Sequence, residues 1–483
     1  MFRFILAATV AFAAQQAASG QATPVAFTNA RLVTIAGDEI ERGTLVVHAG
    51  RIVAVGAAAR VSVPAGATVV DCAGKVIMPG LVDTHNHIGG VGGADGSGTL
   101  QPDVRVYDSI NAMDSGFRRA VAGGLTTLNL MPGSGHLLSG QTVYVKLRPV
   151  KSIEEMMVRW PDGEPMGGIK MANGTNPMRD PPFAGTRGKA AAMVRDLFTR
   201  AQEYQARGGV VRGEKEAGAT DGDGGPGAAD DGAANAGGEP AGEPGGAPGK
   251  KKTLSRDLGM EALGEVLDGR RIVHHHTHRA DDIMTVLRLR EEFGFRVVLH
   301  HVSEAWKVAD EIAAAGAPCS IILVDSPGGK LEASELSFET GAVLERAGVK
   351  VAFHTDDWIT DSRLFLRMAA LGVRAGMSRA GALAALTIRG AEMMDLQDRI
   401  GTLEAGKDAD FVILSGDPFS VYTRIEQTWV EGVRVFDLTD EKDRLHAEGG
   451  FGAGRDQTPY FCCFDAESFV FGRSGTVWQA GGK

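Results

Sequence analysis

Two histidines near residue 85 have the spacing of a pair of metal ligands. Asp83, His85 and His87 follow the apolar run at residues 76–82 and are separated from one another by single residues. Side chains two residues apart in an extended strand point to the same face, so the two imidazoles should lie side by side. Imidazole nitrogens suit divalent zinc, iron or nickel, and the pair therefore predicts half of a metal site. The alternative is a surface strand that happens to carry two histidines.

Further side chains that could bind a metal follow later apolar runs. Lys170 lies in the run GGIKMANG. The other candidates are His274, His275, His276 and His278 in VHHHTHRADD, His300 and His301 in VLHHVSEA, and His354, Asp356 and Asp357 in FHTDDW. Barrel enzymes place their catalytic groups at the carboxyl ends of the strands. If these runs are strands of one barrel, their polar ends meet at one face.

The central block of the chain alternates between strand-like and helix-like runs. Amphipathic runs at residues 187–206, 280–293 and 304–315 predict helices. Predicted strands cover residues 77–88, 125–131, 142–147, 168–172, 272–278, 296–301, 320–324 and 349–355. Eight strands with crossovers predict an α/β fold of the (β/α)8 barrel type, or TIM barrel. A doubly wound open sheet is the alternative, but no GxGxxG follows an early strand.

The two ends of the chain are rich in short β-type runs with glycine turns. Residues 23–75 and 402–440 are therefore expected to form one composite β-sandwich beside a barrel at 76–401. Residues 213–252 are rich in Gly, Ala, Asp, Glu and Pro, which predicts a disordered low-complexity insertion. The tail at 441–483 gives no clear structural pattern.

The N-terminus and the overall charge limit where the protein works and what it binds. Residues 1–22 have the pattern of a cleaved signal peptide, which predicts a soluble, exported protein, most simply in a bacterial periplasm. An uncleaved membrane anchor is the alternative, although the apolar run is short for a bilayer span. The net charge of −10 speaks against a nucleic-acid binder. The four cysteines lack a CxxC spacing, and we assign none of them a catalytic role.

Taken together, these motifs resemble the amidohydrolase superfamily, and more narrowly its imidazolonepropionase-like and prolidase-like branch. The resemblance rests on PGLVDTHNH, HTHRADDI, HHVSEAW, FHTDD and the closing run GTLEAGKDADFVILSGDP. It covers nearly the whole chain outside the leader and the insertion. It implies a (β/α)8 barrel with a small β-sandwich and one or two divalent metal ions, with zinc as the first expectation.

The resemblance also implies a ligand set. The implied metal ligands are His85, His87, Lys170, His276, His301 and Asp356. His274 is a rival of His276, because alternation places both on one face of the strand. The lysine would be carboxylated and bridge two metals, or bind substrate unmodified, and Lys146 is a second candidate for that position.

Other polar residues near these motifs have two interpretations each. His278 and Arg279 could bind a substrate carboxylate, but Arg279 could equally pair with the two aspartates that follow at 281 and 282. His274, His275 and His300 are expected to hold the ligand tautomers. His136 lies in a glycine-rich loop, where we expect a plain turn.

The parts predict hydrolysis of a carbon–nitrogen bond in a small cyclic amide, an imide or another small amide. A metal lowers the pKa of a water, and Asp356 would act as general base and then as general acid. An exported metallodipeptidase cleaving Xaa-Pro bonds is the nearest alternative. A non-catalytic exported metal- or ligand-binding protein is the alternative from another class. The expected partner is a small-molecule substrate, and the sequence leaves open whether the chain forms homo-oligomers.

Overall fold

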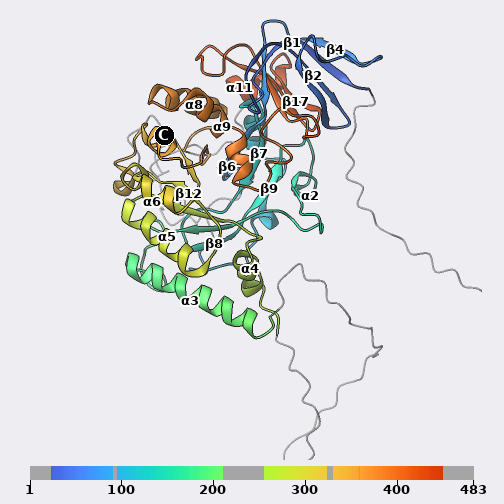
Figure 1. Cartoon of the computed structure of the whole chain (residues 1–483). Helices are drawn as coiled ribbons and strands as arrows, with labels where there is room; N and C mark the ends of the chain where they lie inside the picture. The colour runs from blue at the N-terminus through green and yellow to red at the C-terminus, as the bar shows by residue number, and fades with distance from the viewer. Residues whose placement is uncertain (1–22, 91–94, 210–254, 324–329, 358, 450–483) are drawn as a thin grey trace, which may run out of the picture.

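A computed structural model of the chain describes residues 23–90, 95–209, 255–323, 330–357 and 359–449 (Figure 1). The predicted signal peptide, the low-complexity insertion and the tail from residue 450 lie outside the described residues.

Strands from both ends of the chain pair in one eight-stranded sheet, in the order β17-β16-β15-β5-β1-β2-β3 with β4 beside β1. Figure 1 shows the blue N-terminal and red C-terminal strands side by side at the top of the molecule. The strands are β1 (Val25–Leu32), β2 (Ile40–His48), β3 (Arg51–Ala57), β4 (Thr68–Asp71), β5 (Val76–Pro79), β15 (Phe411–Leu414), β16 (Ile425–Val430) and β17 (Val433–Asp437). The antiparallel pairing of β5 with β15 joins the two ends. The rings of Phe27, Phe411 and Trp429 pack together in this part of the core.

The boundary between this terminal sheet and the central strands lies at Gly80. Residues 76–79, which we expected in the barrel, pair instead with β1 and β15 as strand β5. A Cβ at Gly80 would lie 2.3 Å from the Thr126 side chain, so only glycine allows this close approach. Beyond it the chain enters β6 (Leu81–Asn86), the first central strand.

The central strands form two sheets, β6-β7-β9 and β14-β13-β12-β11-β10-β8. Their further members are β7 (Leu125–Leu130), β8 (Leu138–Gln141), β9 (Val143–Lys146), β10 (Ile169–Ala172), β11 (Val273–Thr277), β12 (Val297–His301), β13 (Cys319–Ile321) and β14 (Val351–Phe353). The β6–β7 pair and all four pairs from β10 to β14 are parallel. The two sheets are joined by the Thr142 N–H bond to Gly168 O (3.0 Å) and the Asp356 N–H bond to His85 O (3.0 Å).

The third predicted strand runs in the opposite direction to the others. β8 is antiparallel to β10, and β9 is antiparallel to β7. The cause is the short connection between β7 and β8, which spans residues 131–137. A parallel crossover needs a dozen or more residues, so this connection cannot return the chain to the other end of the sheet. The regular alternation that we predicted therefore fails at this position.

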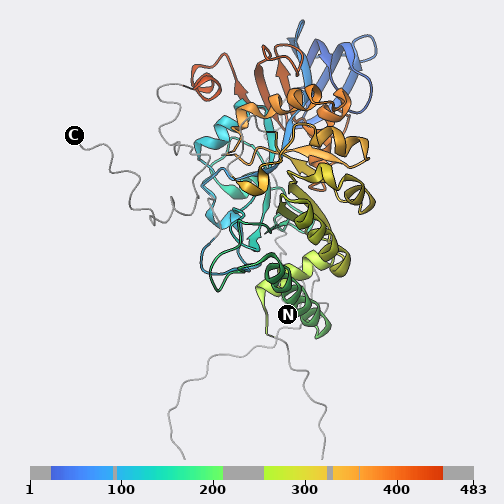
Figure 2. The same ribbon diagram turned by 90° about the vertical axis from the view of Figure 1, so that its left-hand side faces the viewer.

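Helices cover the outside of the central strands, as Figures 1 and 2 show. The predicted helices at 187–206 and 280–293 are α3 (Arg187–Ala206) and α5 (Ala280–Phe293). The predicted helix at 304–315 is split into η2 (Ala305–Lys307) and α6 (Ala309–Ala314). The others are α1 (Ser115–Ala122), α2 (Ile153–Met156), α4 (Leu258–Leu267), α7 (Thr340–Arg346), α8 (Phe365–Arg374), α9 (Arg379–Ala385), α10 (Ile388–Glu392) and α11 (Glu441–Glu448), with 3-10 turns η1 (Val106–Ser109), η3 (Leu331–Ala333) and η4 (Ser362–Leu364). None of the helices in the described ranges combines the length and hydropathy that a bilayer span requires.

Candidate metal centre

The carboxylate of Asp83 fixes the end of β6 against the end of β14. Its Oδ1 accepts the backbone N–H groups of His85 and Thr355, each at 3.1 Å. Its Oδ2 accepts Thr355 Oγ1 at 2.5 Å and Asn86 Nδ2 at 2.9 Å. Burial raises the pKa of Asp83 to about 6, despite these four hydrogen bonds. Two segments far apart in sequence are thereby held together, and both carry predicted metal ligands.

Four predicted ligands converge beside this junction, and we call them the first donor group: His85, His87, Lys170 and Asp356. His85 Nε2 lies 3.1 Å from His87 Nε2 and 2.9 Å from Lys170 Nζ. Asp356 Oδ1 lies 2.9 Å from His87 Nε2 and 3.4 Å from His85 Nε2. Two ligand atoms about 2.0–2.2 Å from one ion are separated by about 3.3 Å in tetrahedral geometry. The spacing of the group is therefore that of a shared cation.

The backbone is strained at two of the predicted ligands. His301 and Asp356 have φ angles of 70° and 48°, and the β-branched Val302 has a φ of 43°. The Val302 N–H donates to His300 O at 3.0 Å, which closes a tight turn around His301. Non-glycine residues adopt such angles only where the surroundings hold them there, and this happens most often at functional sites.

His301 is oriented by a row of polar side chains from neighbouring strands. Its Nδ1 lies 3.1 Å from His354 Nε2, and His354 Nδ1 lies 2.8 Å from Ser320 Oγ. Ser320 Oγ in turn lies 2.6 Å from Thr84 Oγ1. The His301 Nε2 atom is buried and has no hydrogen-bond partner in the part of the chain that the structure describes. Donation from His301 Nδ1 to His354 leaves a lone pair on that Nε2, which suits a metal ligand.

A second row of buried groups ends at His85; we call it the inner chain. His85 Nδ1 lies 3.3 Å from His300 Nδ1, and His300 Nε2 lies 3.0 Å from His274 Nδ1. His274 Nε2 lies 3.0 Å from the Tyr144 hydroxyl. Donation in either direction satisfies every link, and a metal ion on His85 Nε2 requires the direction from His85 toward Tyr144. This direction leaves the lone pair of His85 Nε2 turned toward the first donor group.

His276 and His278 lie on the other side of His301. The ring of His276 is centred 4.4 Å from that of His301 and 4.7 Å from that of His278. Burial lowers the pKa of His276 and of His301 well below the usual range, as it does for His85. These imidazoles are therefore neutral near pH 7, which is the form that binds metals.

The pKa values of Lys170 and Asp356, which also belong to the first donor group, are shifted as well. Burial lowers the pKa of the Lys170 amine to about 7, even though Asp356 nearby raises it. Burial alone would raise the pKa of Asp356, but the hydrogen bond and charge of His87, together with the charges of His354 and Lys170, hold it below its usual range. Near neutral pH the aspartate is ionised and about half of the Lys170 amine is unprotonated.

The structure decides between several alternatives that the sequence leaves open. Lys146 lies away from the histidines: its Nζ is 2.6 Å from both Asp408 Oδ2 and Asp410 Oδ2. Lys170 is thus the lysine of the first donor group. Arg279 is exposed and forms a bidentate pair with Asp281 at 2.9 Å, so its guanidinium sits at the start of α5.

Three residues near the motifs form hydrogen bonds with groups outside the first donor group. His274 belongs to the inner chain, and the His275 ring donates to the His276 carbonyl at 3.0 Å. Asp357 accepts the Ser362 N–H at 3.0 Å. The motif analysis missed Tyr144, which ends the inner chain, and Glu332, whose carboxylate lies near His276 and His278; both contacts depend on the fold. The role of Asp83 could have been suspected, because it shares the spacing by two with His85.

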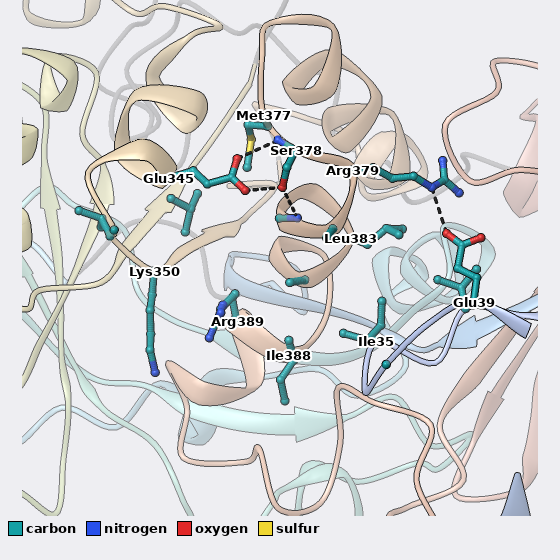
Figure 3. Close-up of a pocket in the computed structure, with 18 of the residues that line it drawn as sticks. Ile35, Glu39, Glu345, Lys350, Met377, Ser378, Arg379, Leu383, Ile388 and Arg389 are labelled. Carbon is teal, nitrogen blue, oxygen red and sulfur yellow. Dashed lines mark hydrogen bonds and ion pairs between the residues drawn. The ribbon is translucent and has the colours of Figure 1, made fainter. Parts of the chain in front are cut away.

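A groove of about 840 Å3 lies at the opposite end of the central strands (Figure 3). Lys350, which lines it, precedes β14, whereas Asp356 follows the end of that strand. The groove contains the ion pair of Arg379 with Glu39 (3.0 Å) and none of the predicted metal ligands. It is therefore separate from the candidate metal centre.

Comparison with known proteins places the chain in a family. The profile of the amidohydrolase family matches residues 259–436. Amidohydrolase tasK of Hapsidospora irregularis is 27% identical over 405 residues, which cover 80% of this chain and 39% of that protein. An imidazolonepropionase of Sphingopyxis alaskensis is 38% identical over 87 residues, 17% of this chain and 21% of that protein. The chain thus spans about two fifths and about one fifth of these two relatives.

A solved structure matches over its full length. The crystal structure of an amidohydrolase from Thermotoga maritima is 30% identical, with a TM-score of 0.72. The match covers 86% of this chain and 100% of that one. The resemblance drawn from the motifs is confirmed: the chain belongs to the amidohydrolase family.

Proposed function

We propose that the protein is a metal-dependent hydrolase of a carbon–nitrogen bond in a small cyclic amide or imide. The observation that carries this proposal is the first donor group, in which two imidazoles, a lysine amine and an ionised carboxylate lie close together, with His85 Nε2 beside both His87 Nε2 and Lys170 Nζ and His87 Nε2 beside Asp356 Oδ1. Family membership supports the reaction class. The choice of a cyclic substrate rests on the sequence motifs and on the local similarity to imidazolonepropionases.

The residues present fit a divalent metal ion. Imidazole nitrogens, a carboxylate oxygen and a neutral amine are ligands that zinc accepts, and we propose zinc as the ion. The buried Nε2 of His301, unpartnered among the described residues, offers a further ligand atom. His85, His87, Lys170 and Asp356 would hold one ion, and His276 and His301 extend the set toward a second. Such an ion supplies an acidified water and polarises the scissile carbonyl.

The chain's own groups then handle the protons. The Asp356 carboxylate is ionised near neutral pH and is the ligand side chain with the most contact with solvent, at 19% exposure. It accepts the proton of the attacking water and passes it to the departing nitrogen as the tetrahedral intermediate collapses. The Met131 carbonyl, 2.7 Å from His87 Nδ1, orients the His87 ring beside the carboxylate, and the backbone bond from Asp356 N to His85 O fixes the position of Asp356. His278 is proposed to face the substrate from the side of His301.

We further propose that the two central sheets form one closed barrel with the metal centre at its carboxyl end, and that residues 1–22 direct export to the periplasm. Support for closure comes from the bonds at Thr142 and Asp356 that join the sheets. Support for export is the sequence pattern of the N-terminus.

The proposal is tested with the full chain after removal of metal by a chelator. Zinc or manganese is then added, and turnover is measured on a panel of cyclic amides and imides and on a panel of dipeptides that includes Xaa-Pro. We expect metal-dependent turnover of the cyclic compounds. Turnover of dipeptides alone would assign the protein to the metallodipeptidases. Metal binding without turnover of either panel would favour a non-catalytic binding protein.

A further inference from the structure

Lys330 lies beside the candidate metal centre and has no ion-pair partner among the described residues. It directly precedes η3 and stands two residues before Glu332. A carboxylate oxygen of Glu332 lies within 4.8 Å of donor atoms of both His276 and His278. Lys330 is exposed, whereas these three residues are buried. The lysine therefore lies on the solvent side of the centre.

The charge of Lys330 acts on the groups of the centre. Burial lowers the pKa values of Lys170, His276 and His278, and the charge of Lys330 lowers them further. Burial among neighbouring groups also lowers the pKa of Lys330, while the charges of Glu332 and Asp356 raise it. An exposed amine that is still partly desolvated stands on the wall of a cleft. Lys330 thus lines the approach to Asp356.

Other cations at this end of the central strands have counter-ions. Their pairs are Arg187 with Asp282 (2.8 Å), Arg279 with Asp281 (2.9 Å) and Lys307 with Glu335 (2.7 Å). Lys330 has no such pair in the described ranges, and a divalent ion in the first donor group would bring a further positive charge near it. A negative charge that arrives with the substrate would balance both cations.

Glu332 is the acidic side chain closest to Lys330 in sequence, but it is held by other groups. Its Oε2 accepts the Thr175 N–H at 2.8 Å and lies 3.5 Å from Arg187 Nη2. The charge of Glu332 is therefore partly balanced by Arg187. The Lys330 ammonium group remains available for an anion from outside the chain.

His278 can offer a hydrogen bond to the same anion. Burial lowers the pKa of His278 to about 3, so its ring is neutral and carries one proton near pH 7. Its Nδ1 lies 2.8 Å from Ser303 Oγ, and the hydroxyl can donate to it. The proton then lies on Nε2, which is buried and has no hydrogen-bond partner in the described part of the chain. An N–H group and an ammonium group together suit a carboxylate.

We propose that Lys330 and the Nε2–H group of His278 bind a carboxylate of the substrate. The preferred substrate is then a cyclic amide or imide that carries a carboxylate. This inference rests on the proposed function, because it names the substrate class of the same site. Lys330 takes the task that the sequence suggested for Arg279, whose guanidinium pairs with Asp281 instead.

The test compares cyclic compounds with and without a carboxylate: 5-oxoproline with 2-pyrrolidinone, and hydantoin-5-acetic acid with hydantoin. Equilibrium dialysis measures their binding to the full, metal-loaded chain carrying Asp356→Asn, and kcat/KM is measured with Asp356 in place. We expect the carboxylated member of each pair to bind more tightly. Lys330→Met should weaken its binding and lower its kcat/KM about 10-fold or more, and leave the uncharged member unchanged. Lys330→Arg should keep the preference, and His278→Phe should reduce it.

Lys307→Met is the matched control, because this lysine lies at the same end of the strands but is ion-paired, and it should change neither quantity. Equal binding of both members, or no binding of the carboxylated ones, would overturn the inference. A preference that survives Lys330→Met would also overturn it, because another group would then hold the carboxylate. Turnover of cyclic amides without any preference would leave the proposed function intact. A Lys330-dependent binding preference without turnover of any cyclic amide would support the inference and contradict the proposed function. Melting temperatures verify that each variant is folded.

Discussion

At the scale of single residues, the centre depends on which atoms carry protons. Asp356 has two tasks in the proposed reaction, as a ligand and as the proton carrier. We predict that Asp356→Asn retains the first ion, because the amide oxygen can still coordinate, but loses about 10²–10⁴-fold in kcat. Metal content and turnover of the variant, measured side by side, check the retained ion and the lost activity. Turnover at the wild-type level would remove Asp356 from its assigned role.

The inner chain makes a second prediction at this scale. In the inner chain His300 Nδ1 accepts the hydrogen bond from His85 Nδ1. This keeps the lone pair of His85 Nε2 turned toward the first donor group. His300→Leu should lower metal affinity about 10–100-fold, the usual effect of losing a group that orients a ligand. His275→Leu is the control, because His275 is equally buried but bonds only the backbone of the next residue. Equal affinities in the two variants would show that the inner chain does not orient His85.

At the scale of secondary-structure elements, the position of the centre depends on the contact between β6 and β14. Asp83 accepts two hydrogen bonds from Thr355 across this contact and two more from His85 and Asn86 within its own segment. Asp83→Ala leaves buried donors without partners, and we predict a loss of about 3 kcal/mol or more in unfolding free energy together with weaker metal binding. Urea unfolding measures the first effect. Asp103→Ala, at an exposed position, should change neither quantity, and an equal loss there would contradict the explanation.

The same elements explain what sequence could predict and what it could not. Strand geometry alone predicts that His85 and His87 point to one face, and the periodicity of residues 187–206 predicts the helix. Both features could be predicted from the sequence. The reversal of β8 and β9 depends on the length of a loop, which the strand pattern does not reveal. The choice of Lys170 over Lys146 depends on which carboxylates the fold brings near each amine. Glu332 stands in no recognisable motif. The histidines near it, His276 and His278, come from a distant part of the sequence, and only the fold brings them together.

At the scale of the whole molecule, buried and partly buried ion pairs attach the terminal sheet to the central strands. Lys146, in β9, bonds Asp408 and Asp410 just before β15. Arg148, just after β9, forms a bidentate pair with Glu431 at 2.6 and 2.7 Å. None of the predicted metal ligands takes part in these contacts, so we expect them to affect the stability of the assembly more than the metal site.

The pH dependence of stability should report on this attachment. Burial raises the pKa of Glu431, but the hydrogen bond from Arg148 and the charges of Lys146, Arg148 and Arg399 lower it from 4.5 to about 2. A carboxyl with a depressed pKa stabilises the fold above its unfolded pKa, and that contribution disappears as the pH falls from about 4.5 to about 2. We predict that Glu431→Gln lowers the unfolding free energy by up to about 3 kcal/mol at pH 7.

Urea unfolding of the wild type and Glu431→Gln at a series of pH values tests this attachment. The difference between the two proteins should be constant above pH 5 and shrink toward zero near pH 2, because the wild-type carboxyl is then protonated in the unfolded chain and about half protonated in the folded one. A difference that stays constant down to pH 2 would mean that Glu431 stabilises the contact through its shape and not its charge. Added salt separates the two cases independently, since it weakens the charge contribution of a partly exposed pair and leaves packing unchanged.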